Sequence, residues 1–144
     1  MRRSILSKHR SFPTSILFFS VCRIPSGQVD CLELPAGMMD DDSNTIKGTA
    51  VKEMEEECGI IIQAEELVDL TQFTQKGGGG IPLSQGGCDE YMRFFYLEKS
   101  VSKSQLDSMR NRLTGLRQEG EVITLRVVPY EDVWRISADS KAIM

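Results

Sequence analysis

The sequence has few of the residues that most metal and nucleophile chemistries need. Among its 144 residues it has a single histidine, His9, and four cysteines, no two of which form a CxxC pair. Histidine-based zinc sites, zinc ribbons, thioredoxin-like motifs and Ser-His or Cys-His nucleophiles therefore lack most of their parts. Widely spaced cysteines are typical of a reducing compartment. We expect any chemistry of this chain to rely on carboxylates.

Long apolar runs and an excess of positive charge are also missing. The longest strongly apolar run, Ser15 to Cys22, is far shorter than the ~20 residues of a membrane helix. The chain has 17 basic and 21 acidic residues, a net charge of -4. No membrane span is predicted. Nucleic acid is a poor candidate partner, because binding to its phosphates needs a basic surface.

The N-terminal composition differs from that of the rest of the chain. The first 29 residues hold five basic residues and six serines and no acidic residue, as in organelle transit peptides. Ser15 to Arg23 also reads as a buried strand, so at most residues 1–14 are a remnant of a targeting segment. A chloroplast is the compartment we expect if that reading holds, and the cytoplasm otherwise.

Hydrophobic patterning predicts one domain of the α/β (α+β) class over residues 15–144. Strands are predicted at 16–22, 29–34, 60–62, 67–73, 91–97 and 122–128. Helices are predicted from a cap at Thr45 to Cys58, at 104–113, and from Glu131 onward, with Gly59 just past the end of the first. Residues 77–87 contain six of the twelve glycines and predict a mobile loop.

The first predicted helix is unusually acidic. Seven acidic and two basic residues lie between positions 37 and 59. On a helical wheel Glu53, Glu56 and Glu57 share one face, where like charges repel one another and also oppose the helix dipole. A hard divalent cation such as Mg²⁺ or Mn²⁺ would compensate this charge. The alternative is a solvated acidic face on which Lys52 pairs with one glutamate.

The order of residues in this segment resembles the Nudix box. The second half of the signature corresponds to Lys52-Glu53-Met54-Glu55-Glu56-Glu57-Cys58-Gly59-Ile60. The first half departs from it: Gly37 lies one residue too far upstream and Asn44 stands at the position of a glutamate. Lys52 replaces an arginine and lacks the planar fork that would orient a carboxylate.

Further motifs resemble one branch of that family, the ADP-sugar diphosphatases of plants. They lie at 32–38, 68–71, 84–90 and 127–135, and the resemblance extends from about Arg23 to Met144. It implies the Nudix α/β/α sandwich with a mixed β-sheet, and hydrolysis of ADP-ribose or ADP-glucose to AMP and a sugar 1-phosphate. It also implies a homodimer, and a chain shortened at both ends relative to the family.

The resemblance also assigns roles to individual residues. Glu53 and Glu57 correspond to Mg²⁺ or Mn²⁺ ligands, Glu56 to an additional or water-mediated ligand, and Ala36 to a backbone carbonyl ligand. Glu57 also counts as catalytic.

Other roles fall outside the acidic helix. The general base falls on Asp89 or Glu90, with Glu90 the better match, although both can simply flank a strand. The resemblance assigns substrate binding to Arg23, Gly37 and Asp89.

Two functions from different classes remain open at this point. One is a metal-dependent diphosphatase of nucleoside diphosphate sugars. The other is a catalytically weak or inactive Nudix-like protein that binds nucleotides.

Overall fold

The computed structural model describes residues 15–23, 26–39, 45–74 and 79–143. The predictions for residues 1–14, for Asn44 and for the glycines at 77–78 lie outside these ranges. The chain divides into two compact units. We call Met1–Pro35 with Lys103–Met144 the sheet unit, and Ala36–Ser102 the helix unit.

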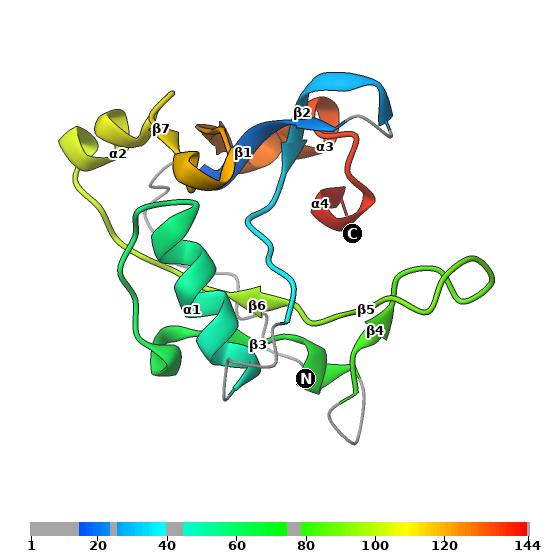
Figure 1. Ribbon diagram of the computed structural model, residues 1–144. Coiled ribbons are helices and arrows are strands. Elements are labelled where there is room, and N and C mark those ends of the chain that lie inside the picture. The colour runs from blue at the N-terminus through cyan, green and yellow to red at the C-terminus, as the bar shows by residue number, and fades with distance from the viewer. Residues whose placement is uncertain (1–14, 24–25, 40–44, 75–78, 144) are drawn as a thin grey trace, which may run out of the picture. The chain divides into compact units, whose positions relative to one another are not determined.

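The sheet unit is built on four antiparallel strands (Figure 1). They are β1 (Ser15–Arg23), β2 (Gln28–Glu33), β7 (Leu113–Thr114) and β8 (Ile123–Pro129). Their order is β2-β1-β8-β7, so β1 pairs with β2 on one side and with β8 on the other. Ile123, Leu125 and Val127 are buried and alternate with half-buried residues along β8. The hairpin and the last strand are therefore confirmed.

Short helices complete the sheet unit. They are α2 (Lys103–Met109), η4 (Arg117–Glu119), η5 (Tyr130–Asp132), α3 (Val133–Ile136) and α4 (Ser140–Ile143). The single helix predicted from Glu131 onward is wrong, because Ser137 interrupts it. The Ser137 hydroxyl donates a hydrogen bond to the Leu32 carbonyl of β2 and accepts one from the Asp139 amide. These hydrogen bonds attach the segment between α3 and α4 to β2 of the sheet.

The helix unit contains α1 (Ile46–Glu56) and a set of very short elements. These are η2 (Ala64–Glu66), β3 (Val68–Asp69), η3 (Thr71–Phe73), β4 (Ile81–Pro82), β5 (Tyr91–Met92) and β6 (Phe95–Tyr96). Thr45 caps α1 as predicted, because its hydroxyl accepts a hydrogen bond from the Gly48 amide. Gly59 follows the helix with φ of 61° and donates its amide to the Glu55 carbonyl. Both ends of the helix thus follow from capping chemistry.

Three strands predicted in the helix unit are shorter than expected or absent. Residues 60–62 form no strand, 67–73 form β3 followed by a 3-10 turn, and 91–97 split into β5 and β6. The split has a clear cause. The Phe94 amide donates to the buried Thr71 hydroxyl, and its carbonyl accepts from the Leu70 amide, so this residue bonds to the η3 segment.

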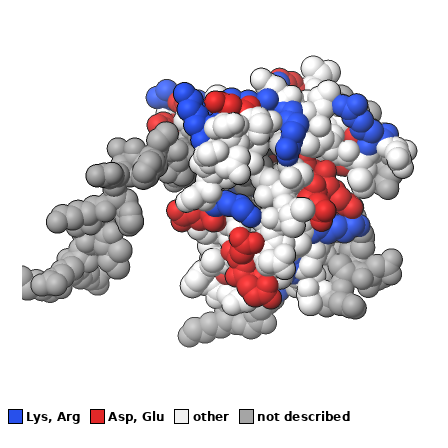
Figure 2. All heavy atoms as spheres, turned by 90° about the vertical axis from the view of Figure 1, so that its left-hand side faces the viewer, with Lys and Arg blue, Asp and Glu red and all other residues white. Residues whose placement is uncertain are grey.

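The architecture belongs to the predicted α/β class, with one difference in the sheet. Every strand pairing that the structure describes is antiparallel, so the parallel component of the expected mixed sheet is not among them. Within the described part of the chain, no helix has the length and apolarity to cross a bilayer. Basic and acidic side chains are intermixed over the face drawn in Figure 2.

Candidate functional site

A turn at Ala36 and Gly37 lies against the acidic end of α1. The Ala36 amide donates a hydrogen bond of 3.2 Å to Oε2 of Glu57, whose side chain is buried. A methyl group on Gly37 would overlap the carboxyl end of Glu53, so only glycine leaves room for that side chain. The structure therefore brings together four residues that the sequence assigned to the site.

The third glutamate of that face is held differently. Glu56 is half-buried, and its carboxylate lies 3.9 Å from the Lys52 ammonium, one helical turn away. Glu55, between them in sequence, is exposed. The ion pair between Lys52 and Glu56 is the contact expected if this face of the helix is only a solvated acidic surface. The ion pair joins Lys52 to Glu56 and not to Glu53 or Glu57.

The donor atoms at this turn fit a hard divalent cation by their chemistry. Glu53, Glu57 and the backbone of Ala36 offer oxygen, which Mg²⁺ prefers. Within the described ranges, however, no group of three or more His, Cys, Asp or Glu side chains is assembled closely enough to hold a metal ion. The fit therefore rests on two carboxylates and the backbone.

Asp89 and Glu90 lie at the end of a β-hairpin of the helix unit. β4 and β5 pair antiparallel, and the Leu83 amide donates to the Glu90 carbonyl. The Ser84 carbonyl accepts from the Gly87 and Cys88 amides, which closes the turn. Both acidic side chains are exposed. The second half of the predicted mobile loop is thus a hydrogen-bonded hairpin that presents two carboxylates to solvent.

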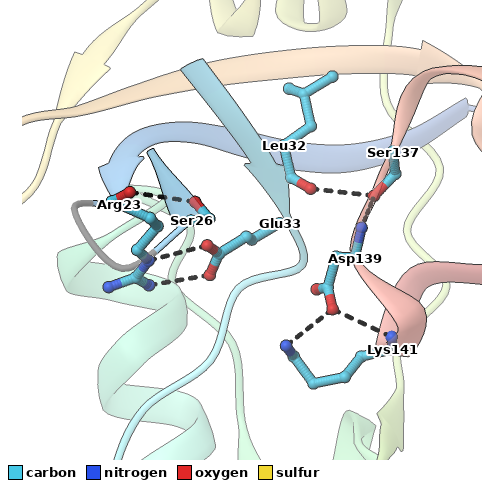
Figure 3. Close-up of polar contacts among 7 residues, drawn as sticks. All are labelled: Arg23, Ser26, Leu32, Glu33, Ser137, Asp139 and Lys141. Carbon is cyan, nitrogen blue, oxygen red and sulfur yellow. Dashed lines mark hydrogen bonds and ion pairs between the residues drawn. The ribbon is translucent and has the colours of Figure 1, made fainter. Parts of the chain in front are cut away.

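Arg23 belongs to the sheet unit, at the end of β1. Its guanidinium donates two hydrogen bonds of 2.8 Å to the Glu33 carboxylate of β2 (Figure 3). The hydrogen bond and charge of Arg23 lower the pKa of Glu33, although partial burial opposes this. The sequence did not single out Glu33, but opposite charges on the two strands of one hairpin are a usable signal for such a pair.

A second buried acid, Asp69, was not predicted as a central residue. Its carboxylate pairs with Arg93 and accepts hydrogen bonds from the Thr71 amide (3.0 Å) and the Gln72 side chain (3.2 Å). Burial acts to raise the pKa of Asp69, but the Arg93 bond and charge, with the backbone bonds, hold it below its ordinary value.

The signal for this network was the spacing of Asp69 and Thr71, which is typical of a side chain that binds an amide two residues later. The network fixes β3 to the segment that directly follows the β4–β5 hairpin.

Comparison with known proteins agrees with the reading of the acidic helix. The model of the NUDIX domain matches residues 8–144. Nudix hydrolase 14, chloroplastic, of Arabidopsis thaliana is 46% identical over 123 residues, which cover 85% of this chain and 40% of that protein. The chain thus spans about two fifths of the length of this relative. With the family model covering nearly its whole length, including the Ala36–Gly37 turn and α1, this chain belongs to the Nudix family.

Proposed function

We propose that the chain is a metal-dependent hydrolase that cleaves the diphosphate bond of a nucleoside diphosphate sugar, ADP-ribose or ADP-glucose, to AMP and a sugar phosphate. The observation that carries the proposal is the placement of two carboxylates at one turn. Glu57 is buried against the Ala36 amide, and the Glu53 side chain lies over Gly37. This arrangement keeps acidic oxygens together at one turn, which supports the binding of a metal ion and a diphosphate there.

Glu53, Glu57 and the Ala36 carbonyl would hold Mg²⁺ or Mn²⁺, with Glu56 as an additional ligand. A bound divalent ion neutralises diphosphate oxygens and acidifies a water molecule. The protein itself contributes rigidity: the Ala36 amide fixes one oxygen of Glu57, and the glycine next to it leaves space for Glu53. Nudix hydrolases generally use such metals, which supports this assignment.

Glu90 is the proposed general base. It is exposed at the end of the β4–β5 hairpin, so its carboxylate is accessible to a water molecule. We expect Glu90→Gln to lower kcat by about 10²- to 10⁴-fold, the usual range for a general base, with little change in metal affinity. Asp89→Asn is the matched control and should cost much less. An unchanged kcat in Glu90→Gln, or a larger loss in Asp89→Asn, contradicts the assignment.

The cellular location and the oligomeric state follow from composition and from family resemblance. A chloroplast location is supported by the basic, serine-containing N-terminal composition and by the name of the Arabidopsis relative, which is chloroplastic. A homodimer is proposed from the family resemblance alone. Sedimentation of the purified chain tests the homodimer, and imaging of a fluorescent fusion tests the location.

Product analysis is the experiment that tests the hydrolytic function. The chain is incubated with ADP-ribose, ADP-glucose and the matching UDP-sugars in Mg²⁺, with an excess of chelator as the control. We expect AMP from ADP-sugars and almost none from the chelated sample. Absence of products with every sugar nucleotide would overturn the proposal, and full activity in chelator would overturn its metal dependence.

A second function is favoured by one observation. Lys52 stands where the Nudix signature has an arginine, and its ammonium lies 3.9 Å from the Glu56 carboxylate, a pair that a nucleotide-binding Nudix protein without useful turnover can keep. Such a protein would bind ADP-sugars and release them unchanged. Calorimetric titration with ADP-ribose, run beside the product analysis, separates binding without turnover from catalysis.

A further inference from the structure

The sheet unit contains a polar pocket that none of the proposed metal ligands lines. Its volume is about 240 Å³, and it lies between the β1–β2 hairpin and the segment that leads into α4. Its lining includes Arg23, Gln28, Cys31, Glu33, Asp139 and Lys141. Figure 3 shows four of these side chains facing one another across this region.

Asp139 is the residue of this pocket with an unmet bonding requirement. Its side chain is only 6% exposed, and its Oδ1 atom accepts hydrogen bonds from the Lys141 amide (3.0 Å) and ammonium (2.8 Å). Oδ2 is buried and has no hydrogen-bond partner among the residues that the structure describes. A buried carboxylate oxygen left unbonded is costly, so this atom calls for a donor.

The charges of the pocket indicate what kind of donor fits. The two cations, Arg23 and Lys141, are each paired with a carboxylate, Glu33 and Asp139 respectively. Burial, together with the hydrogen bond to Glu33, raises the pKa of the Cys31 thiol and keeps it neutral. The four charged groups therefore sum to zero, and a phosphate entering the pocket would meet two carboxylates. A neutral ligand with hydroxyl donors fits better than an anion.

The size of the pocket narrows the ligand further. Pockets for drug-sized molecules usually enclose about 300–1,000 Å³, and this one is smaller at about 240 Å³. It therefore suits a single sugar ring rather than a whole sugar nucleotide. Gln28 is exposed at its rim and offers both an amide donor and an acceptor.

We propose that this pocket binds a neutral monosaccharide group, with Asp139 Oδ2 accepting a hydrogen bond from one hydroxyl and the Gln28 amide contacting another. Because Oδ2 is not exposed to solvent, the hydroxyl reaches it only when a neighbouring side chain moves, and the partly exposed Lys141 side chain, which binds Oδ1, is the one that turns away. The choice of D-ribose and D-glucose as ligands rests on the proposed function, because these are the sugars of ADP-ribose and ADP-glucose.

Binding of free sugars tests this site without any hydrolysis. The full ¹⁵N-labelled chain is titrated with D-ribose and D-glucose, and the amide signals of Gln28, Asp139 and Lys141 are followed by NMR. We expect saturable shifts at these amides. Asp139→Asn should weaken the affinity about tenfold, as expected for a hydrogen bond to a charged group.

Two further variants keep the result decisive. Asp132→Asn removes a carboxylate of the same region that pairs with Arg135 outside the pocket, and it should bind sugar as well as the unmodified chain. The side-chain oxygen in Asp139→Asn can still accept the hydrogen bond from the Lys141 amide. If this variant fails to fold, Gln28→Ala, at an exposed position, replaces it in the test and should also weaken sugar binding.

The proposal has clear contrary outcomes. Absence of saturable shifts at the pocket amides would overturn it, as would equal affinity of all variants. Tighter binding of inorganic phosphate than of sugar at the same amides would overturn the assignment to a neutral ligand. Because no turnover is measured, sugar binding by a chain that forms no AMP supports the pocket while rejecting the proposed function.

Discussion

The two units of the chain are each stabilised internally by a different kind of interaction. In the sheet unit, β1 and β8 are nine and seven residues long, and Ile123 and Leu125 are almost completely buried. In the helix unit, each of the four strands has two residues. Side-chain hydrogen bonds there join segments that the short strands leave unpaired. For example, the Lys47 ammonium donates hydrogen bonds to the Ala64 and Leu67 carbonyls.

Stability is therefore concentrated differently in the two units. A long ladder with an apolar face shares the stabilisation among many residues. A set of short strands joined by buried polar groups concentrates it in a few side chains, because leaving one partner of a buried pair alone is costly. The proposed catalytic residues lie in the unit of the second kind, so substitutions near the site should be tested for stability as well as activity.

The largest effect is expected from Asp69→Asn in the helix unit. Removing this charge leaves the Arg93 guanidinium largely buried without its counter-charge, at a cost of about 3–5 kcal/mol in unfolding free energy. Urea denaturation followed by circular dichroism measures it. Glu55→Gln, at an exposed position, is the control and should stay within about ±0.5 kcal/mol. A loss below about 1 kcal/mol for Asp69→Asn would show that the pair is dispensable.

The sheet unit should be broken most effectively through its core. Leu125→Ala removes a fully buried side chain of β8 and should lower the unfolding free energy by about 2–5 kcal/mol. Thermal unfolding measures the loss, with Val29→Ala at an exposed position of β2 as the control. Equal stability of the two variants would contradict the view that this unit depends on apolar burial.

Gly37→Ala should separate activity from stability. The added methyl group displaces the flexible end of Glu53, so kcat should fall about 100-fold, the cost of a displacement of about 1 Å at a reacting group. The unfolding free energy should change by no more than about 0.5 kcal/mol, since the glutamate can turn into solvent. Gly86→Ala is the matched control, because its methyl group would meet nothing. Unchanged kcat in Gly37→Ala would remove Glu53 from the site.

Acidification should destabilise both units in the same direction. The folded-state pKa values of Asp69 and Glu33 lie below their ordinary values of 3.8 and 4.5. The stabilisation is therefore complete above the unfolded-state values and is lost as the pH falls through the folded-state values. Urea unfolding is measured from pH 6 down to pH 2. The urea concentration at the midpoint should decrease once the pH is lower than about 4.5. This fall should be smaller in Asp69→Asn, and an equal fall in both proteins would be contrary to expectation.

The smallest effect is expected from Arg23→Gln. Its ion pair with Glu33 has good geometry, but Arg23 is 50% exposed, so solvent screening limits the contribution to about 0–1 kcal/mol. Urea denaturation of this variant beside Asp69→Asn compares an exposed pair of the sheet unit with a buried pair of the helix unit. A loss of unfolding free energy as large as that of Asp69→Asn would mean that single ion pairs are equally important for stability in the two units.

The sequence predicted the elements with strong local signals. The Thr45 cap, the Gly59 end of α1 and the alternating pattern of β8 were all readable from neighbouring residues. The shortened strands of the helix unit were not, because Phe94 leaves the strand to bond a threonine more than twenty residues away.

In the candidate site too, features set by neighbouring residues could be predicted and features set by distant residues could not. The acidic face of α1 was visible from helical spacing, whereas the placement of Gly37 under Glu53 depends on how the chain folds back. The pairing of Asp69 with Arg93 depends on it too, since 24 positions separate them.

The strand order β2-β1-β8-β7 also has a consequence for synthesis on the ribosome. β1 pairs with β2 across a short turn, but its other edge waits for β8, about a hundred residues later. At about 5–20 residues per second, that delay is on the order of 5 to 20 seconds. Meanwhile the unpaired edge of β1 can recruit chaperones or pair with another nascent chain. The helix unit is continuous in sequence and is translated entirely within this interval.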